Sequence, residues 1–350
     1  MKLTKWTKWA AIAGVTVMLT SGCSLLKSKE SAQIDPPQSL TGTNTTAGGK
    51  GTEAVATGAS VQQGVPITLY MKDKNNYVAP VTVQVPKTDA VARKTLEYMV
   101  EDGAGKGIVP ADFKALLPKG TTIKGLDINK DKKVATVDFS SQFANYNAAD
   151  ERKLLEAVTW ALTGFTGVNE VRIWVEGKEL KEMPKGHLPI DGSLTRAMGI
   201  NVERAEGVDF GQTTPVTLYF LGQTSGMNSY YVPITRLVKR TDDKAKATIE
   251  QLIAGPGKDS LFSVIGSAVD MPKIESANGV ITVKFTDTLL GPDKKAPGEA
   301  LQSIVLSLTE LSSDTKVQIM VNNDVKVSST DNQVYSKPVA RPSTVNAIKM

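Results

Sequence analysis

The sequence predicts an α+β protein made of two tandem copies of one unit, each a mixed β-sheet with helices packed on it. Two observations predict this class. Residues 65–70 (VPITLY) match residues 214–219 (TPVTLY), and further matches follow at nearly constant offsets along the chain. Each copy also has the same order of patterns, which is strand, strand, helix, strand, strand, helix, strand, with a short tail.

The strands are indicated by short runs in which apolar and polar residues alternate, as in strands with one buried face. Residues 134–139 (VATVDF) correspond to residues 280–285 (VITVKF). Residues 171–175 (VRIWV) correspond in the same way to residues 317–321 (VQIMV). These matches predict that the two copies share their later strands as well as their first.

Two helices in each copy are indicated by apolar residues three and four positions apart. Thr88 and Thr241 precede the first helix of each copy, and we expect them to be its N-caps. The dipeptide Asn278-Gly279 is typical of a type I′ turn, which predicts a hairpin in the second copy. The apolar stripes of the four helices are Ala92, Leu96, Met99 and Val100; Ala245, Ile249, Leu252 and Ile253; Leu155, Val158, Leu162 and Phe165; and Leu301, Ile304, Leu308 and Leu311.

Composition excludes several classes of site. The chain of 350 residues has one cysteine, Cys23, and one histidine, His187. A single cysteine excludes an internal disulfide and a cysteine-based zinc cluster, and a single histidine excludes a metal site that needs two imidazoles. Three lysines in residues 1–22 account for three of the five net positive charges, which leaves +2, so we expect no nucleic-acid partner.

Residues 1–22 have the form of a bacterial lipoprotein signal peptide. Three lysines precede an apolar run at residues 9–19, and small residues then precede Cys23. The run is shorter than the roughly 20 residues of a membrane-spanning helix. We therefore expect cleavage before Cys23, lipidation of that cysteine by a diacylglycerol group with acyl chains such as palmitate, and attachment of the mature protein to a membrane.

Residues 23–64 lack apolar periodicity and are rich in small and polar residues, which predicts a flexible tether. About 40 such residues span about 35 Å on average and about 130 Å when stretched. We expect the first unit to cover residues 65–202 and the second to cover residues 214–348, joined by a linker at residues 203–213.

One acidic segment has part of a calcium-loop pattern. Asp127, Asn129 and Asp131 have the spacing with which such a loop opens. However, Lys132 stands where the loop needs glycine, and the second copy has its predicted hairpin turn at the same place. We therefore favour a hairpin over a metal site.

Three other motifs also have a structural interpretation that we favour. The glycine-rich segments 103–107 and 255–258 follow helices, whereas a phosphate loop precedes one, so we expect helix ends. His187 lies in a proline-rich stretch without a counterpart in the second copy, and we expect an exposed loop residue. Asp150 and Glu151 lie near a helix start, where negative charge is favourable, and no carboxylate pair is shared between the copies.

The aromatic residues allow two interpretations. Trp160 lies on the helix that carries Leu155 and Phe165 and is expected in the core or at its edge, and Tyr77 and Tyr231 recur at matching places. A sugar-binding groove would require Trp174, Tyr230 and Tyr231 to meet on one surface. The positions shared between the copies are core, turn and cap residues, which favours a binding or assembly module over a catalyst.

The whole chain resembles the family of sporulation and germination lipoproteins with two tandem GerMN domains, found in endospore-forming bacilli. The resemblance rests on the lipobox cysteine, the tether, the opening Pro-[Ile/Val]-Thr-Leu-Tyr strands, the Thr-Asp helix starts, the Gly-x-Gly-Lys turns and the closing Arg-x3-[Ile/Val]-Asn, which is Arg196 to Asn201 in the first copy and Arg341 to Asn346 in the second. It implies a fold like the ring-building motifs of secretion systems. It implies no catalytic residues and no cofactor.

The resemblance also implies a location and a role. It implies a protein anchored through Cys23 in the outer forespore membrane, facing the intermembrane space, where it places or stabilises the protein channel between mother cell and forespore. The expected partners are the membrane and protein components of that channel. The alternative is a peptidoglycan-binding module that positions or regulates a spore cell-wall hydrolase. We expect no enzymatic activity of the protein itself, because the sequence offers neither the catalytic acid pair nor the metal site that a hydrolase needs.

Overall fold

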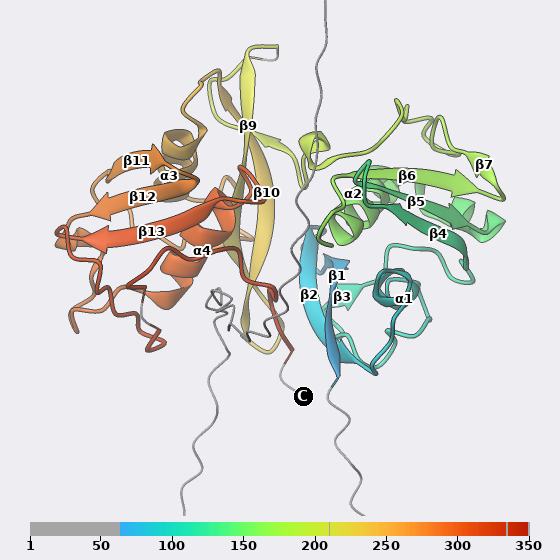
Figure 1. The fold of residues 1–350 in the computed structure, drawn as a ribbon, viewed down its shortest axis with the longest axis horizontal. Helices are drawn as coiled ribbons and strands as arrows, with labels where there is room; N and C mark the ends of the chain where they lie inside the picture. Colours follow the sequence, from blue (N-terminus) through green and yellow to red (C-terminus); the bar gives the residue numbers. More distant parts are fainter. Residues whose placement is uncertain (1–63, 210, 334, 349–350) are drawn as a thin grey trace, which may run out of the picture. The chain divides into compact units, whose positions relative to one another are not determined.

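The computed structural model describes residues 64–209, 211–333 and 335–348, and the predicted α+β class is confirmed (Figure 1). We call residues 65–202 the first repeat and residues 214–348 the second repeat. The first repeat contains β1 (Val65–Asp73), β2 (Val78–Val85), α1 (Val91–Tyr98), β3 (Phe113–Lys114), β4 (Ile123–Asn129), β5 (Val134–Phe139), the 3-10 helices η1 (Ser141–Asn145) and η2 (Ala148–Asp150), α2 (Glu151–Leu162), β6 (Glu170–Val175), β7 (Lys178–Glu179) and η3 (Arg196–Met198).

The second repeat has the same order of elements as the first, except that it lacks counterparts of β3, η2, β7 and η3. After β8 (Glu203–Arg204), which lies in the predicted linker, come β9 (Thr213–Gln223), β10 (Ser229–Lys239), α3 (Lys244–Ala254), β11 (Lys273–Ala277), β12 (Val280–Phe285), η4 (Asp287–Leu289), α4 (Gly298–Leu308) and β13 (Lys316–Val321).

Each repeat divides its strands between two sheets. In the first repeat the strand orders are β2-β1-β3 and β4-β5-β6-β7, and in the second they are β8-β10-β9 and β11-β12-β13. The sequence predicts one mixed sheet in each copy, whereas the structure has two. The second sheet of each pair is mixed, because β5 runs parallel to β6, and β12 parallel to β13. The opening hairpins have matching registers, because Thr68 pairs with Thr82 and Thr217 pairs with Thr235.

The burial of the strands follows their position. In β5 and β12 every second residue is buried, as alternation in the sequence predicts. Strands β2 and β10 are instead buried at almost every residue. Each strand is covered on both faces, because β2 and β10 lie against one another while α2, α3 and α4 pack on the hairpins that contain them (Figure 1).

The predicted N-caps are wrong. Thr88 Oγ1 accepts a hydrogen bond from the backbone N–H of Ala90, and Thr241 Oγ1 accepts one from Asp243, so both threonines form turns ahead of the helices. Asp243 caps α3 through its side chain, which accepts from the N–H of Lys246.

Helix α1 is also shorter than its apolar stripe predicts. It ends at Tyr98, and Val100 forms a β-bridge with Leu117. The predicted hairpin turn is confirmed, since Asn278 and Gly279 have φ angles of 53° and 74°, the left-handed values that a type I′ turn requires.

Candidate functional site

The predicted lipidation site, Cys23, lies outside the described residues, as do the signal peptide and almost all of the tether. None of the helices in the described part of the chain is long and apolar enough to cross a membrane. The lipid anchor therefore stays a prediction of the sequence.

The calcium-like segment forms the turn between β4 and β5. Asn129 Oδ1 accepts a hydrogen bond of 2.8 Å from the N–H of Lys132, and Lys133 has a φ of 56°. Within residues 64–209, 211–333 and 335–348, no group of three or more His, Cys, Asp or Glu side chains could hold a metal ion. The favoured hairpin is confirmed.

The glycine-rich segment after α1 is explained by backbone packing. A Cβ on Gly105 would lie 2.3 Å from the carbonyl oxygen of Tyr98, which is closer than real Cβ contacts. Gly255, directly after α3, has a φ of 81° and ends that helix. Both segments follow their helices, as predicted.

The acid pair at the start of α2 holds neighbouring loops. Asp150 forms an ion pair of 2.5 Å with Lys72 on β1. Glu151 is buried and accepts hydrogen bonds from Tyr146 Oη at 2.5 Å and from the N–H of Gly186 at 2.6 Å. Burial alone would raise the pKa of Glu151, but these hydrogen bonds outweigh it and lower the pKa. The two carboxylates therefore have separate structural partners.

His187 lies at the surface, as the sequence predicts. Its side chain is 70% exposed, and its Nδ1 lies 3.3 Å from Glu182 Oε1, whose side chain is also exposed. Because both side chains are exposed, the pair has the chemistry of an exposed loop contact.

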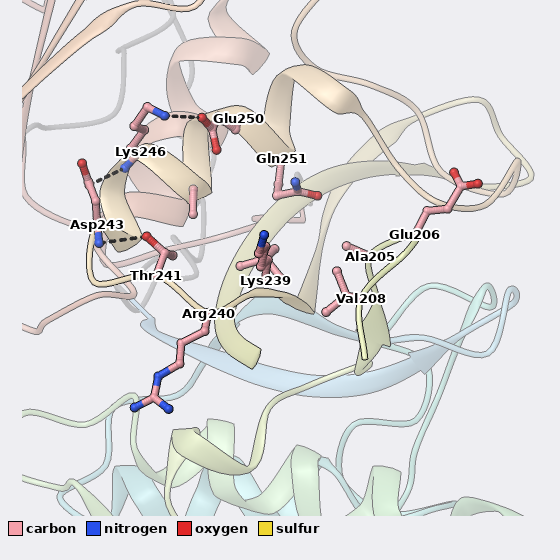
Figure 2. A pocket seen from close by; sticks show the side chains of 12 residues that line it. Ala205, Glu206, Val208, Lys239, Arg240, Thr241, Asp243, Lys246, Glu250 and Gln251 are labelled. Atoms are coloured by element: carbon pink, nitrogen blue, oxygen red, sulfur yellow. Dashed lines mark hydrogen bonds and ion pairs between the residues drawn. The ribbon is translucent and has the colours of Figure 1, made fainter. Parts of the chain in front are cut away.

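A hollow of about 320 Å³ lies between the segment after β8, the end of β10 and the start of α3 (Figure 2). Two of its charged groups form an ion pair, because Lys246 Nζ lies 2.7 Å from Glu250, and Asp243 accepts a hydrogen bond from the backbone N–H of Lys246. Figure 2 shows Arg240 extending away from the other lining side chains.

The aromatic residues do not form a sugar-binding groove. Tyr230 and Tyr231 lie on β10 and are only 4% and 8% exposed, whereas Trp174 lies on β6 and is 36% exposed. Trp160 is fully buried in α2, as predicted. The three residues that the peptidoglycan alternative requires are thus in different environments.

The most extensive polar arrangement joins the two repeats, and we call it the pairing interface. It consists of β2, β10 and the tails that close the repeats, residues 195–204 and 341–348. Each tail crosses to the other repeat. Residues Glu203 and Arg204 in β8 pair in parallel with Arg236 and Leu237 of β10, and Ala347 forms a parallel bridge with Thr82 of β2.

Each tail is bound by a threonine of the opposite repeat. The N–H of Ile200 donates to Thr235 Oγ1 at 2.9 Å, and the N–H of Val345 donates to Thr82 Oγ1 at 3.1 Å. Thr82 and Thr235 occupy equivalent positions in their hairpins. The two tails therefore dock in the same way, and the pairing interface has approximate twofold symmetry.

Two equivalent asparagines lie between β2 and β10. Asn201 Nδ2 donates to the carbonyls of Val78 and Pro233, both at 2.8 Å, and its Oδ1 accepts from Val78. Asn346 Nδ2 donates at 2.8 Å to the carbonyls of Tyr231 and Pro80, and its Oδ1 accepts from Tyr231. Each amide thus uses both ends of its side chain to join two strands from different repeats.

A charged cluster also joins the two repeats. Arg196 and Arg341, one from each tail, form ion pairs of 2.8 Å with Glu310, which also accepts 2.7 Å from Tyr219 Oη. Burial would raise the pKa of Glu310, but the attraction of Arg196 and Arg341 outweighs it and lowers that pKa to about 2. The carboxylate therefore stays ionised at neutral pH.

A second cross-repeat contact involves a buried acid. Tyr230 Oη donates 2.8 Å to Asp73, and the Tyr230 ring packs edge-on against Phe113 at 4.9 Å. Burial raises the pKa of Asp73 above its ordinary value, against the effect of its hydrogen bonds. Outside the two tails, Asp112 also accepts from Ser225 at 2.6 Å.

The sequence contained part of the signal for this interface. The repeated ending Arg-x3-[Ile/Val]-Asn marks both tails and includes Arg196, Asn201, Arg341 and Asn346. Comparison of the copies did not reveal Glu310, because the matching position of the first repeat has Gly164.

Comparisons with known proteins agree over both repeats. The family model described as "Germane: Sporulation and spore germination" matches residues 68–181 and 217–326. The chain is 37% identical to the spore germination protein GerM of Bacillus subtilis strain 168, over 97% of this chain and 98% of that protein. The solved structure of the tandem GerMN domains of the sporulation protein GerM from Bacillus subtilis is similar with a TM-score of 0.75 and 38% identity, over 81% of this chain and 99% of that chain.

Proposed function

Because the chain belongs to the Germane family of sporulation and spore germination, we propose that it is a non-enzymatic, lipid-anchored scaffold of endospore formation. In this proposal it is needed for both sporulation and germination. It is attached through Cys23 to the outer forespore membrane, faces the intermembrane space, and places or stabilises the channel between mother cell and forespore.

The observation that carries the proposal is the pairing interface. The exchanged tails and the bridging asparagines hold the two repeats together. The sheets β4-β5-β6-β7 and β11-β12-β13 therefore keep a fixed position relative to one another. A scaffold needs such a constant relation, because two docking surfaces on one rigid body bind a multi-site partner more tightly than two independent ones.

The environments of the buried acidic residues support a non-enzymatic role. The buried acids Glu151, Glu310 and Asp73 bind Tyr146, Arg196 and Tyr230 of the same chain, which are structural partners. Burial of Tyr230 and Tyr231 also removes the aromatic surface on which the peptidoglycan alternative depends.

The proposal is tested by following a fluorescent channel component in sporulating cells that lack this protein. We expect the component to lose its position at the forespore membrane, and a lipidated wild-type copy to restore it. Sedimentation of the purified protein with cell-wall sacculi is the parallel measurement. Normal channel placement without the protein, together with strong binding to sacculi, would favour the peptidoglycan alternative.

A further inference from the structure

In the charged cluster, Arg196 and Arg341 occupy equivalent positions in the two repeats, whereas Glu310 has no counterpart in the first repeat. Arg196 donates to Trp160 O and Thr163 Oγ1 at the end of α2. Arg341 donates to the corresponding groups at the end of α4, Leu306 O and Thr309 Oγ1. Each arginine therefore binds the end of the second helix of its own repeat in the same manner.

The carboxylate between them comes from one repeat only. Glu310 directly follows Thr309, whereas Gly164 directly follows Thr163. Arg196 Nη1 donates to both carboxylate oxygens at 2.9 and 2.8 Å, and Arg341 Nη2 lies 2.8 Å from one of them. The side chain of Glu310 is 7% exposed, so its charge has little contact with water.

We propose that Glu310 determines which repeats pair with one another. At the charged cluster the first repeat supplies Arg196 and no carboxylate. Its tail also carries Glu203, which forms a separate ion pair of 2.7 Å with Arg236 on β10. At the cluster the first repeat fits a repeat that supplies both an arginine and a carboxylate, which is a second repeat, from its own chain or from another copy. Two first repeats would instead bring two guanidinium groups together without a counter-ion, and like charges in a partly desolvated place repel.

Two second repeats also make a poorer pair. They would bring two carboxylates to the place that one Glu310 occupies between the arginines. The single carboxylate therefore favours the pairing of unlike repeats over that of like repeats, and it does so through charge rather than shape. This inference concerns the pairing interface and stands whether or not the protein is a channel scaffold.

The approximate symmetry allows the carboxylate to be moved to the other repeat. Gly164 has no positive φ, and a Cβ there would lie 3.3 Å from Ala161 O and 3.5 Å from Trp160 O, so a side chain needs only a small adjustment. A glutamate at position 164 follows the end of α2 as Glu310 follows the end of α4.

The test uses the full chain purified in detergent. E310G removes the carboxylate of the charged cluster, so it measures pairing when each repeat brings only its arginine to that place. The separate ion pair between Glu203 and Arg236 is the same in every variant. G164E/E310G moves the carboxylate to the first repeat. T166E/E310G is the matched control, because it has the same net charge but places the carboxylate two residues further along an exposed loop.

Two readouts separate pairing from folding. Thermal unfolding reports stability, and trypsin cleavage at Arg204 reports opening, because β8 contains this residue and pairs with β10. We expect E310G to lower the melting temperature by roughly 5 °C and to speed cleavage at least fivefold. G164E/E310G should recover more than half of both effects, and T166E/E310G should recover neither.

Two results overturn the proposal. One is an E310G chain with unchanged melting temperature and cleavage rate, whatever the moved carboxylate does. The other is recovery in T166E/E310G equal to that in G164E/E310G, because net charge and not position would then explain the effect.

Discussion

Replacing either bridging asparagine by alanine should destabilise the pairing of the repeats by the same amount. Asn201→Ala removes two donated hydrogen bonds of 2.8 Å and one accepted from Val78, and Asn346→Ala removes the equivalent three around Tyr231. At a net value of about 1 kcal/mol for each hydrogen bond, the expected loss is about 3 kcal/mol for either variant.

The backbone conformation adds a second term. Asn201 and Asn346 have φ angles of 48° and 54°, and alanine adopts this left-handed region less readily, at a cost of about 1 kcal/mol. Asn278→Ala is the matched control, because Asn278 has a φ of 53° in an exposed hairpin turn away from the pairing interface. We therefore expect a total loss of about 4 kcal/mol at the interface and about 1 kcal/mol at the control.

The assay is urea unfolding of the three variants and the wild type, monitored by circular dichroism. Losses in Asn201→Ala and Asn346→Ala that do not exceed that of Asn278→Ala would refute the reasoning, because the side-chain hydrogen bonds would then contribute nothing. A large loss in only one of the two would refute the symmetry of the interface.

Three further predictions concern other parts of the chain. Cys23→Ala should move the protein from the membrane fraction to the soluble fraction, and unchanged attachment on fractionation would count against lipidation. The pKa of Glu310 is lowered to about 2 in the folded protein, so the stabilisation that its carboxylate provides is present above about pH 4.5. This stabilisation is lost as the pH falls toward 2, by about 3 kcal/mol in total. Glu310→Gln should remove this part of the acid dependence when unfolding is measured across that pH range. Gly105→Ala should cost about 2 kcal/mol because its Cβ would lie 2.3 Å from Tyr98 O, whereas Gly226→Ala, whose nearest contact is 3.5 Å, should change the free energy of unfolding by less than about 1 kcal/mol.

The repeat made the order of elements predictable. Matching strands such as 134–139 and 280–285 have alternation that reports one buried face, and the Asn278-Gly279 turn depends on local chemistry alone. Local patterns say less about pairing between distant strands. The division of each repeat into two sheets, and the burial of β2 on both faces, depend on β10 and on helices far away in the sequence.

The pairing interface illustrates the same limit. The ending that contains Asn201 and Asn346 was visible as a repeated motif, but its role requires the carbonyls of Pro233 and Pro80, which belong to the opposite repeat. Glu310 breaks the repeat, so a search for shared positions passes over it. Residues that join two copies of a fold can therefore be the ones in which the copies differ.

Cross-linking in sporulating cells tests most directly the proposal that the paired repeats act as one scaffold for the channel. The protein is recovered with antibodies after cross-linking, and its neighbours are identified by mass spectrometry, for the wild type and for Asn201→Ala/Asn346→Ala at equal abundance. We predict that channel components dominate the wild-type neighbours and fall several-fold in the double variant. Neighbours dominated by muropeptides or cell-wall hydrolases, or channel cross-links unchanged in a double variant shown to be unpaired, would contradict the account.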